Sequence, residues 1–145
     1  MVNNKIRIGV IGLGYLGKVH YEKYKASKLV NLTSVVDTDK KNYSIIKEKG
    51  ELIFKKYQDI VDKVDAVSIV TPTVTHYKIA KYFLDNKIHV LLEKPMTETV
   101  VQAKKLNAIE KKNKCVLQIG HLEQFNPAIR KLRKNNCKPK FIEVH

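Results

Sequence analysis

The sequence predicts an α/β fold built on a doubly wound parallel sheet, and three features support that prediction. Short apolar segments of strand type alternate with amphipathic helical segments along the chain. One segment, residues 66–70, has an apolar character interrupted only by Ser68, as expected of a central parallel strand covered on both faces. A strand, a glycine-rich turn and a helix follow one another near the N-terminus. The 145 residues suffice for one domain with a hydrophobic core.

The first predicted strand, residues 6–11, is rich in β-branched side chains and ends at glycines spaced G-x-G-x-x-G. Gly12 allows the tight turn out of the strand, Gly14 leaves room for a pyrophosphate, and Gly17 lets the next helix pack closely. The unpaired N–H groups and positive dipole end of that helix would face the phosphates. Alone, the motif is as typical of a ligand-free turn as of a Rossmann dinucleotide site.

A second predicted strand, residues 32–36, ends in Asp37, about 20 residues after the glycines, where a dinucleotide site requires an acid. A carboxylate there can accept both hydroxyls of the adenosine ribose. It would also repel the 2′-phosphate of NADP. The sequence therefore predicts binding of NAD in preference to NADP, a preference that Lys40 and Lys41 could weaken. The alternative is that Asp37 is only a turn residue at the end of a strand.

The remaining elements follow from the spacing of apolar residues and from turn residues between them. Thr75 is the expected N-cap of one helix, and Asn126 with Pro127 opens another. After Asp37 we predict helices over 39–49, 57–61 (a single turn), 76–85, 98–112 and from 126 to about 134, and strands over 51–54, 66–70, 88–92, 116–119 and 141–145.

Polar residues gather at the ends of five predicted strands. In open α/β sheets, ligands bind beyond the carboxyl ends of the strands. Any one of these clusters could be an ordinary turn, but five on one rim favour a ligand site. The clusters are residues 12–17, Asp37, 71–76, 93–95 and 120–121.

The net charge of +14 is explained by a lysine-rich surface. Of the 28 basic residues, only Arg7, Arg130 and Arg133 are arginine, and the lysines are spread along every predicted helix. Proteins that bind nucleic acid tend to use arginine and stacking aromatic side chains in a defined motif, and the sequence contains no such motif. A solvated lysine-rich surface is expected, which would still attract an anionic cofactor or nucleotide-sugar.

Membrane, secreted and metal-binding classes are disfavoured. No apolar segment approaches the roughly 20 residues of a membrane span. The N-terminus leads directly into a strand, so no signal peptide is expected. Cys115 and Cys137 lie far apart without the spacing of a metal site, so we expect neither a disulfide nor a metal, and a cytoplasmic location.

Three segments together resemble the glucose–fructose oxidoreductase / inositol dehydrogenase / MocA (Gfo/Idh/MocA) family. They are G-L-G-Y-L-G at 12–17, T-P-T-V-T-H at 71–76 and E-K-P-M at 93–96, the last being the most specific. The segment G-H-L-E-Q-F-N-P at 120–127 is similar to the branch that acts on UDP-N-acetylated sugars, including 3-dehydrogenases of UDP-N-acetylglucosamine or its uronic acid. The resemblance covers essentially the whole chain.

The resemblance implies a cofactor site drawn from four strand ends. Its glycine turn would hold the pyrophosphate, its acid the adenosine ribose, and the residues after the later strands the nicotinamide half. Glu93 would approach the nicotinamide ribose. The implied cofactor-binding residues are Gly12, Gly14, Tyr15, Leu16, Gly17, Asp37, Thr71, Pro72, His76, Glu93 and Lys94.

The implied reaction is hydride transfer from a sugar CH–OH to the nicotinamide ring, with Lys94 as the catalytic residue. Its ammonium can orient the reacting hydroxyl and stabilise developing negative charge. Alternatively, a buried lysine with a lowered pKa can take the hydroxyl proton. His121 is either substrate-facing or merely a turn residue, and His89, in mid-strand, is expected to be structural.

Two departures from the family pattern matter. Where the sugar-nucleotide branch has Arg, this chain has Gln124, which loses the charge and the bidentate fork. Family members also continue into an α+β domain that supplies most of the substrate pocket, a catalytic His and the oligomer interface. The sequence ends at His145, in what corresponds to the first strand of that domain.

We therefore expect a dinucleotide-binding domain over 1–121, and over 122–145 a connector helix and the first strand of a C-terminal domain that is otherwise missing. Such a chain would be a truncated product, a cloned fragment or half of a split enzyme, inactive alone. Its partners would be the dinucleotide and a UDP-sugar, with a homo-oligomer left open. The alternatives are a non-catalytic nucleotide-binding module, sensor or remnant, and, last, a nucleic-acid-binding protein suggested only by charge.

Overall fold

Six parallel strands form one sheet in the order β3-β2-β1-β4-β5-β6 in the computed structural model, which describes residues 5–46, 52–134, 141 and 143. The order reverses between β1 and β4, which confirms the predicted doubly wound α/β sheet and places its switch point at the glycine turn. The strands are β1 (Ile6–Ile11), β2 (Val30–Val36), β3 (Leu52–Phe54), β4 (Ala66–Ile69), β5 (His89–Leu92) and β6 (Leu117–Ile119).

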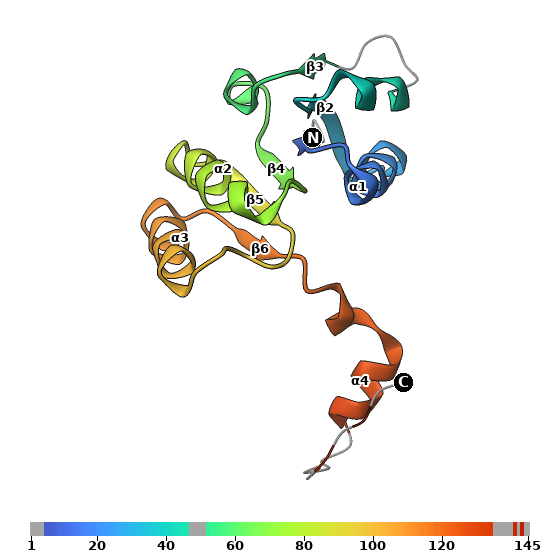
Figure 1. The fold of residues 1–145 in the computed structure, drawn as a ribbon, viewed down its shortest axis with the longest axis vertical. Coiled ribbons are helices and arrows are strands. Elements are labelled where there is room, and N and C mark those ends of the chain that lie inside the picture. The colour runs from blue at the N-terminus through green and yellow to red at the C-terminus, as the bar shows by residue number, and fades with distance from the viewer. Residues whose placement is uncertain (1–4, 47–51, 135–140, 142, 144–145) are drawn as a thin grey trace.

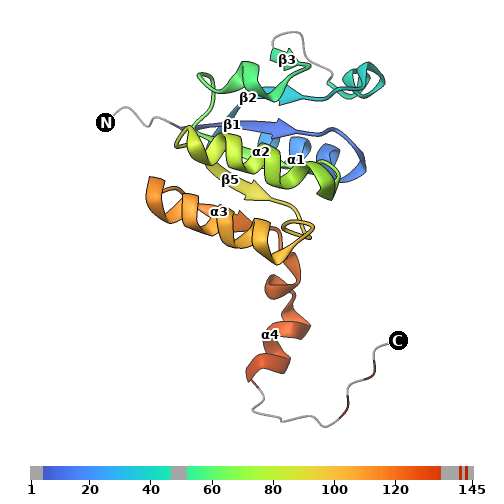
Figure 2. The same cartoon turned by 60° about the vertical axis from the view of Figure 1, so that its left-hand side comes forward.

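Helices cover both faces of the sheet. In Figures 1 and 2, α2 (Thr73–Asp85) and α3 (Val100–Asn113) lie against one face and α1 (Tyr15–Ala26) against the other. The helix α4 (Pro127–Lys134) stands away from the sheet. Three short 3-10 helices complete the described elements: η1 (Lys40–Ile45), η2 (Tyr57–Ile60) and η3 (Leu122–Phe125).

The hydrophobic core has two unequal parts. The larger one joins α2 and α3 to the strands, with Ile69, Phe83 and Leu106 fully buried. The smaller one lies beneath α1 and consists of Val10, Leu13, Tyr21 and Val35. Burial of these apolar side chains is the main force that holds the helices on the sheet.

Most predicted elements are present, with shifted ends. The helix expected over 76–85 begins at Thr73, so Thr75 is not its N-cap; instead the Thr75 hydroxyl donates to Pro72 O at 2.7 Å inside the first turn. A threonine whose hydroxyl bonds a backbone carbonyl of the first turn can lie inside the helix, where it does not act as the N-cap. The helix predicted over 39–49 is the 3-10 helix η1, and its last predicted residues lie outside the described part.

Part of the predicted C-terminal segment lies outside the described residues. Of the strand predicted over 141–145, only Phe141 and Glu143 are described, and neither lies in a strand. Cys137 also falls outside the described residues. Asn126 does precede a helix as predicted, and its side-chain oxygen accepts a hydrogen bond from Ala128 N at 3.0 Å.

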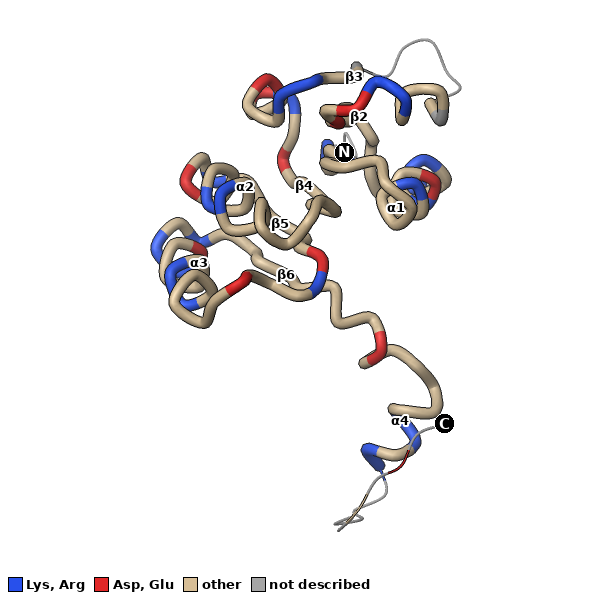
Figure 3. Tube along the Cα trace, viewed as in Figure 1, with Lys and Arg blue, Asp and Glu red and all other residues tan. Residues whose placement is uncertain are grey.

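Charge and hydropathy are distributed as on the surface of a globular domain. Figure 3 shows lysine and arginine on each of the four α-helices rather than gathered on one face. Within residues 5–46 and 52–134, no helix combines the length and apolar character needed to cross a membrane.

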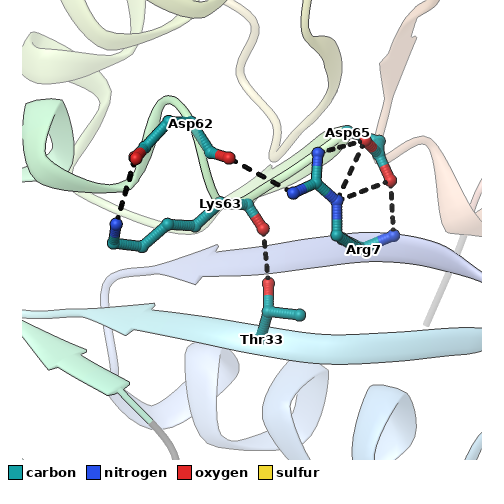
Figure 4. A network of polar contacts seen from close by, with 5 residues as sticks. All are labelled: Arg7, Thr33, Asp62, Lys63 and Asp65. Carbon is teal, nitrogen blue, oxygen red and sulfur yellow. Dashed lines mark hydrogen bonds and ion pairs between the residues drawn. The ribbon is translucent and has the colours of Figure 1, made fainter.

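A polar network ties the sheet together at the end opposite the glycine turn (Figure 4). The Arg7 guanidinium donates to the Asp65 carboxylate at 2.7 Å, and Arg7 N donates to the same carboxylate at 2.8 Å. Arg7 also donates to Asp62 O, and the Thr33 hydroxyl donates to Lys63 O. The network links β1 and β2 to the turn that leads into β4.

This network should make stability depend on pH in the acid range. The hydrogen bonds from Arg7 lower the pKa of Asp65 below its ordinary value of 3.8. A carboxylate whose folded pKa is lowered stabilises the fold above the unfolded pKa, and this contribution is lost as the pH falls through the folded pKa. We expect Asp65→Asn to lower the urea midpoint slightly at pH 7 and to weaken its decline below about pH 4. The exposed Glu22→Gln on α1 is the one-charge control, and an equal effect there would contradict the role of Asp65.

Candidate dinucleotide-binding site

The turn after β1 requires glycine at two of the three positions of its G-x-G-x-x-G motif, because a side chain there would collide with its neighbours. Gly12 has a positive φ of 91°, and a Cβ there would lie 2.7 Å from Val70 O. A Cβ on Gly17 would lie 1.9 Å from Gly12 O, because α1 passes directly against the turn. Gly14 differs: a Cβ there would meet nothing within 4 Å. Gly14 therefore faces open space, where a ligand can approach the backbone.

The N-terminus of α1 lies beside that open space. Gly14 is its N-cap and offers no side chain to the first N–H groups, and the first turn holds no acidic residue. These N–H groups and the positive end of the helix dipole are therefore available to an anion. Tyr15 is highly exposed and Leu16 half-buried, so both of these predicted cofactor residues lie at the rim of the turn.

Asp37, directly after β2, is bonded to the glycine turn. Its Oδ2 accepts a hydrogen bond from Leu13 N at 2.6 Å and from Asn42 Nδ2 at 3.1 Å. Its Oδ1 accepts one from Asp39 N at 2.8 Å. An ionised carboxylate has about four acceptor positions, so about one remains open. The sequence prediction that Asp37 accepts both ribose hydroxyls therefore needs a second acceptor nearby.

A cavity of about 610 Å³ opens at the ends of β1, β2 and β4. Its wall combines apolar side chains with a few polar ones, as small-molecule sites do. Of the predicted cofactor residues, Gly12, Gly14, Asp37, Thr71 and Pro72 line it. The structure thus brings three separate sequence motifs to one cavity.

Three residues with an amide or amine side chain line the cavity without having been predicted from the sequence: Asn42, Lys55 and Lys78. Asn42 could have been suspected from its position five residues after Asp37, in the predicted helix that follows this acid. Lys55 and Lys78 carried no signal among so many lysines. These two lysines line the same cavity as Asp37, which is the acidic residue of its wall.

His76 is buried between two of the turns that follow the central strands. Its ring is 1% exposed, and its two nitrogens lie 2.8 Å from Thr71 O and 2.9 Å from Pro95 O. The side chain thereby joins the turn after β4 to the turn after β5. His76 is not among the residues that line the cavity, and its predicted place in the cofactor cleft stays a prediction.

The residues after β5 point in opposite directions. Lys94 is exposed, whereas Glu93 is 4% exposed and turned inward toward α1, with Oε1 at 3.2 Å from His20 Nε2. The predicted contact of Glu93 with the nicotinamide ribose stays a prediction. The Lys94–Pro95 peptide bond is cis.

The end of β6 completes the rim. His121 is exposed at the start of η3, beside Gly120, which packs against the Glu93 carboxylate. His89 accepts a hydrogen bond from Val116 N at 2.9 Å, a structural contact as expected. Gln124, the departure from the family pattern, is half-buried and accepts a hydrogen bond from Arg130 through its backbone oxygen. Among the described residues, no three His, Cys, Asp or Glu side chains cluster as metal ligands would.

Comparisons with known proteins agree with this geometry. The sequence model of the Gfo/Idh/MocA oxidoreductase family, described as an NAD-binding Rossmann fold, matches residues 6–121. UDP-N-acetylglucosamine 3-dehydrogenase of Acidithiobacillus ferrooxidans is 36% identical over 96% of this chain and 44% of its own length. Its crystal structure superposes with a TM-score of 0.79 over 91% of this chain and 44% of that one.

A second solved structure adds the cofactor. GenD2 from gentamicin A biosynthesis, in complex with NAD, is 27% identical with a TM-score of 0.84 over 90% of this chain and 38% of that one. The chain therefore spans about two fifths of the length of these relatives. Both the sequence and the structural comparison match the nucleotide-binding part of longer proteins.

Proposed function

Since this chain belongs to the Gfo/Idh/MocA oxidoreductase family as an NAD-binding Rossmann domain, we propose that it forms the cofactor half of a dehydrogenase acting on a sugar or nucleotide-sugar. One observation carries the proposal most directly. The Asp37 carboxylate and the bare backbone at Gly14 border one cavity, and Gly14 is also the N-cap of α1. An acid, a glycine backbone and a helix N-terminus are the partners that a ribose and a pyrophosphate need.

The proposed placement of the cofactor follows the sheet order. The adenosine ribose lies at Asp37 and the pyrophosphate over Gly14, on the N–H groups of α1. The nicotinamide half then extends toward the ends of β4, β5 and β6, where Thr71, Lys94 and His121 lie. His76 contributes by holding the turns after β4 and β5 together.

In the proposed reaction, bound NAD supplies a hydride acceptor for the carbon of a CH–OH group. Lys94 is the residue of this chain proposed to act on the substrate. The Lys94 side chain is exposed, so its ammonium group can orient the substrate hydroxyl and stabilise the hydroxyl oxygen as the proton leaves. A role as the proton acceptor requires burial of the amine, which the described residues do not supply.

The proposed domain division stays as predicted, with the dinucleotide-binding domain over 1–121 and a connector over 122–145. A nucleotide-sugar is the favoured substrate class, because the relative at 36% identity is named for UDP-N-acetylglucosamine. The substrate contacts would come largely from a region beyond the two fifths that this chain spans. His121 is the second residue proposed to face the substrate.

Calorimetric titration of the purified chain with NADH and NADPH tests the proposal. We expect NADH to bind with at least about tenfold higher affinity, because the Asp37 carboxylate and a 2′-phosphate repel one another in a partly desolvated site. Both ligands should compete with ADP for the same site. Binding of neither dinucleotide would refute the proposal, and equal affinity for both would remove the role of Asp37 in selectivity.

A further inference from the structure

A buried polar cluster lies behind Lys94, between α1 and the ends of the central strands. It consists of His20 and Tyr24 from α1, Ser68 from β4 and Glu93 after β5. Ser68 and Glu93 are almost fully buried, and the His20 side chain is 11% exposed. Buried polar side chains are costly unless they are paired, so a cluster of this kind has a defined arrangement.

His20 is the centre of the cluster. Its Nδ1 lies 2.7 Å from Ser68 Oγ, and its Nε2 lies 3.2 Å from Glu93 Oε1. A carboxylate only accepts, so the tautomer of His20 that carries its proton on Nε2 is the neutral form that can donate toward Glu93. The Tyr24 hydroxyl also pairs with Ser68, and burial raises the pKa of Tyr24. One α1 histidine therefore contacts both the middle of β4 and the end of β5.

Glu93 connects this cluster to Lys94. Its Oε2 accepts a hydrogen bond from Lys94 N at 3.2 Å. Gly120 leaves the space for the carboxylate, because a Cβ there would lie 2.7 Å from Glu93 Oε1. Among the described residues, Oε1 has no hydrogen-bond donor in good geometry, and His20 is its ion-pair partner. Without His20, Oε1 would lose this contact, and only Oε2 would keep a partner, Lys94 N.

We propose that His20 is a positioning residue, which through Glu93 fixes Lys94 and the turn after β5 relative to α1. The proposal rests on the proposed function, in which the start of α1 holds the pyrophosphate and Lys94 lies on the nicotinamide side. His20 itself touches neither cofactor nor substrate. It sets the spacing between the two halves of the site, since α1 carries one half and β5 carries the other.

The two ring nitrogens of His20 can be tested separately. In His20→Gln the side-chain amide lies near the former Nε2 and can donate to Glu93, whereas in His20→Asn it lies near Nδ1 and reaches only Ser68. His20→Ala removes both contacts. Gly120→Ala is an independent disturbance, since its Cβ displaces the Glu93 carboxylate.

Titration of each variant with NADH and with ADP distinguishes positioning from general damage, because ADP lacks the nicotinamide half. We expect His20→Ala, His20→Asn and Gly120→Ala to lose about tenfold in NADH affinity while ADP affinity is unchanged. His20→Gln should retain NADH affinity within about threefold. Thermal unfolding by circular dichroism establishes that each variant is folded at the titration temperature.

Three results would overturn the proposal: unchanged NADH affinity in every variant, equal losses of NADH and ADP, or rescue by Asn as good as by Gln. If His20→Ala does not fold, the contrast between Gln and Asn decides. Failure of the wild-type chain to bind NADH is a separate result, which overturns the proposed function and this inference with it.

Discussion

Gly17→Ala should lower the free energy of unfolding by about 3 kcal/mol or more, the upper range for inserting a methyl group into a packed site. The added Cβ would lie 1.9 Å from the backbone oxygen of Gly12, and the backbone fixes the position of a Cβ, so no side-chain rotation can relieve the contact. Either α1 moves away from β1 or the turn changes shape. Urea unfolding followed by circular dichroism measures the loss.

Gly14→Ala is the matched control, since the same methyl group there meets no atom within 4 Å and φ is −59°. Its stability should stay within about 0.5 kcal/mol of the wild type. Its NADH affinity should fall by at least about tenfold, because the methyl group occupies the space proposed for the pyrophosphate. Equal destabilisation by the two substitutions would contradict the packing role of Gly17.

Asp37→Ala should reduce NADH affinity by about a hundredfold, the upper range for removal of one charge-assisted hydrogen bond to a ligand. The variant should also lose the preference for NADH over NADPH, since the like-charge repulsion disappears. Calorimetric titration with both dinucleotides measures the two effects together. Because Asp37 also holds Leu13 N, a thermal unfolding curve is needed to separate lost affinity from lost stability.

Asn42→Ala gives the finer test of the same site. Three protein donors occupy the Asp37 carboxylate, so we expect Asn42, whose amide oxygen is available beside it, to accept the second ribose hydroxyl. The variant should bind ADP about tenfold less well and lose sensitivity to removal of one hydroxyl, measured with 2′-deoxy- and 3′-deoxy-ADP. Unchanged discrimination between ADP and both deoxy analogues would contradict this assignment.

The sequence predicted the parts of this molecule that depend on local patterns. The glycine turn, Asp37 and the alternation of strands and helices are each specified within a few residues, and the fold confirmed the doubly wound sheet. Helix ends were less accurate, as at Thr75, because a threonine hydroxyl can bond its own first turn as well as cap it.

Contacts between distant segments were not predictable in the same way. The His20 ring contacts Ser68, which lies 48 residues further along the chain, and Glu93, which follows the next strand. Nothing in the local sequence marks His20 as facing β4 rather than solvent. The inward direction of Glu93 likewise depends on the absence of a side chain at Gly120, which only the folded sheet brings beside it.

The hydrogen bond from Leu13 N to Asp37 is a contact within the protein itself, and it has a consequence for the entropy of association. A glycine-rich turn is conformationally free in the unfolded chain, and ordering it is unfavourable. Here that ordering occurs on folding, because Asp37 holds the turn from β2 and α1 holds it from the other side. A dinucleotide would meet a preorganised turn, so little of its interaction free energy would be offset by immobilising the backbone.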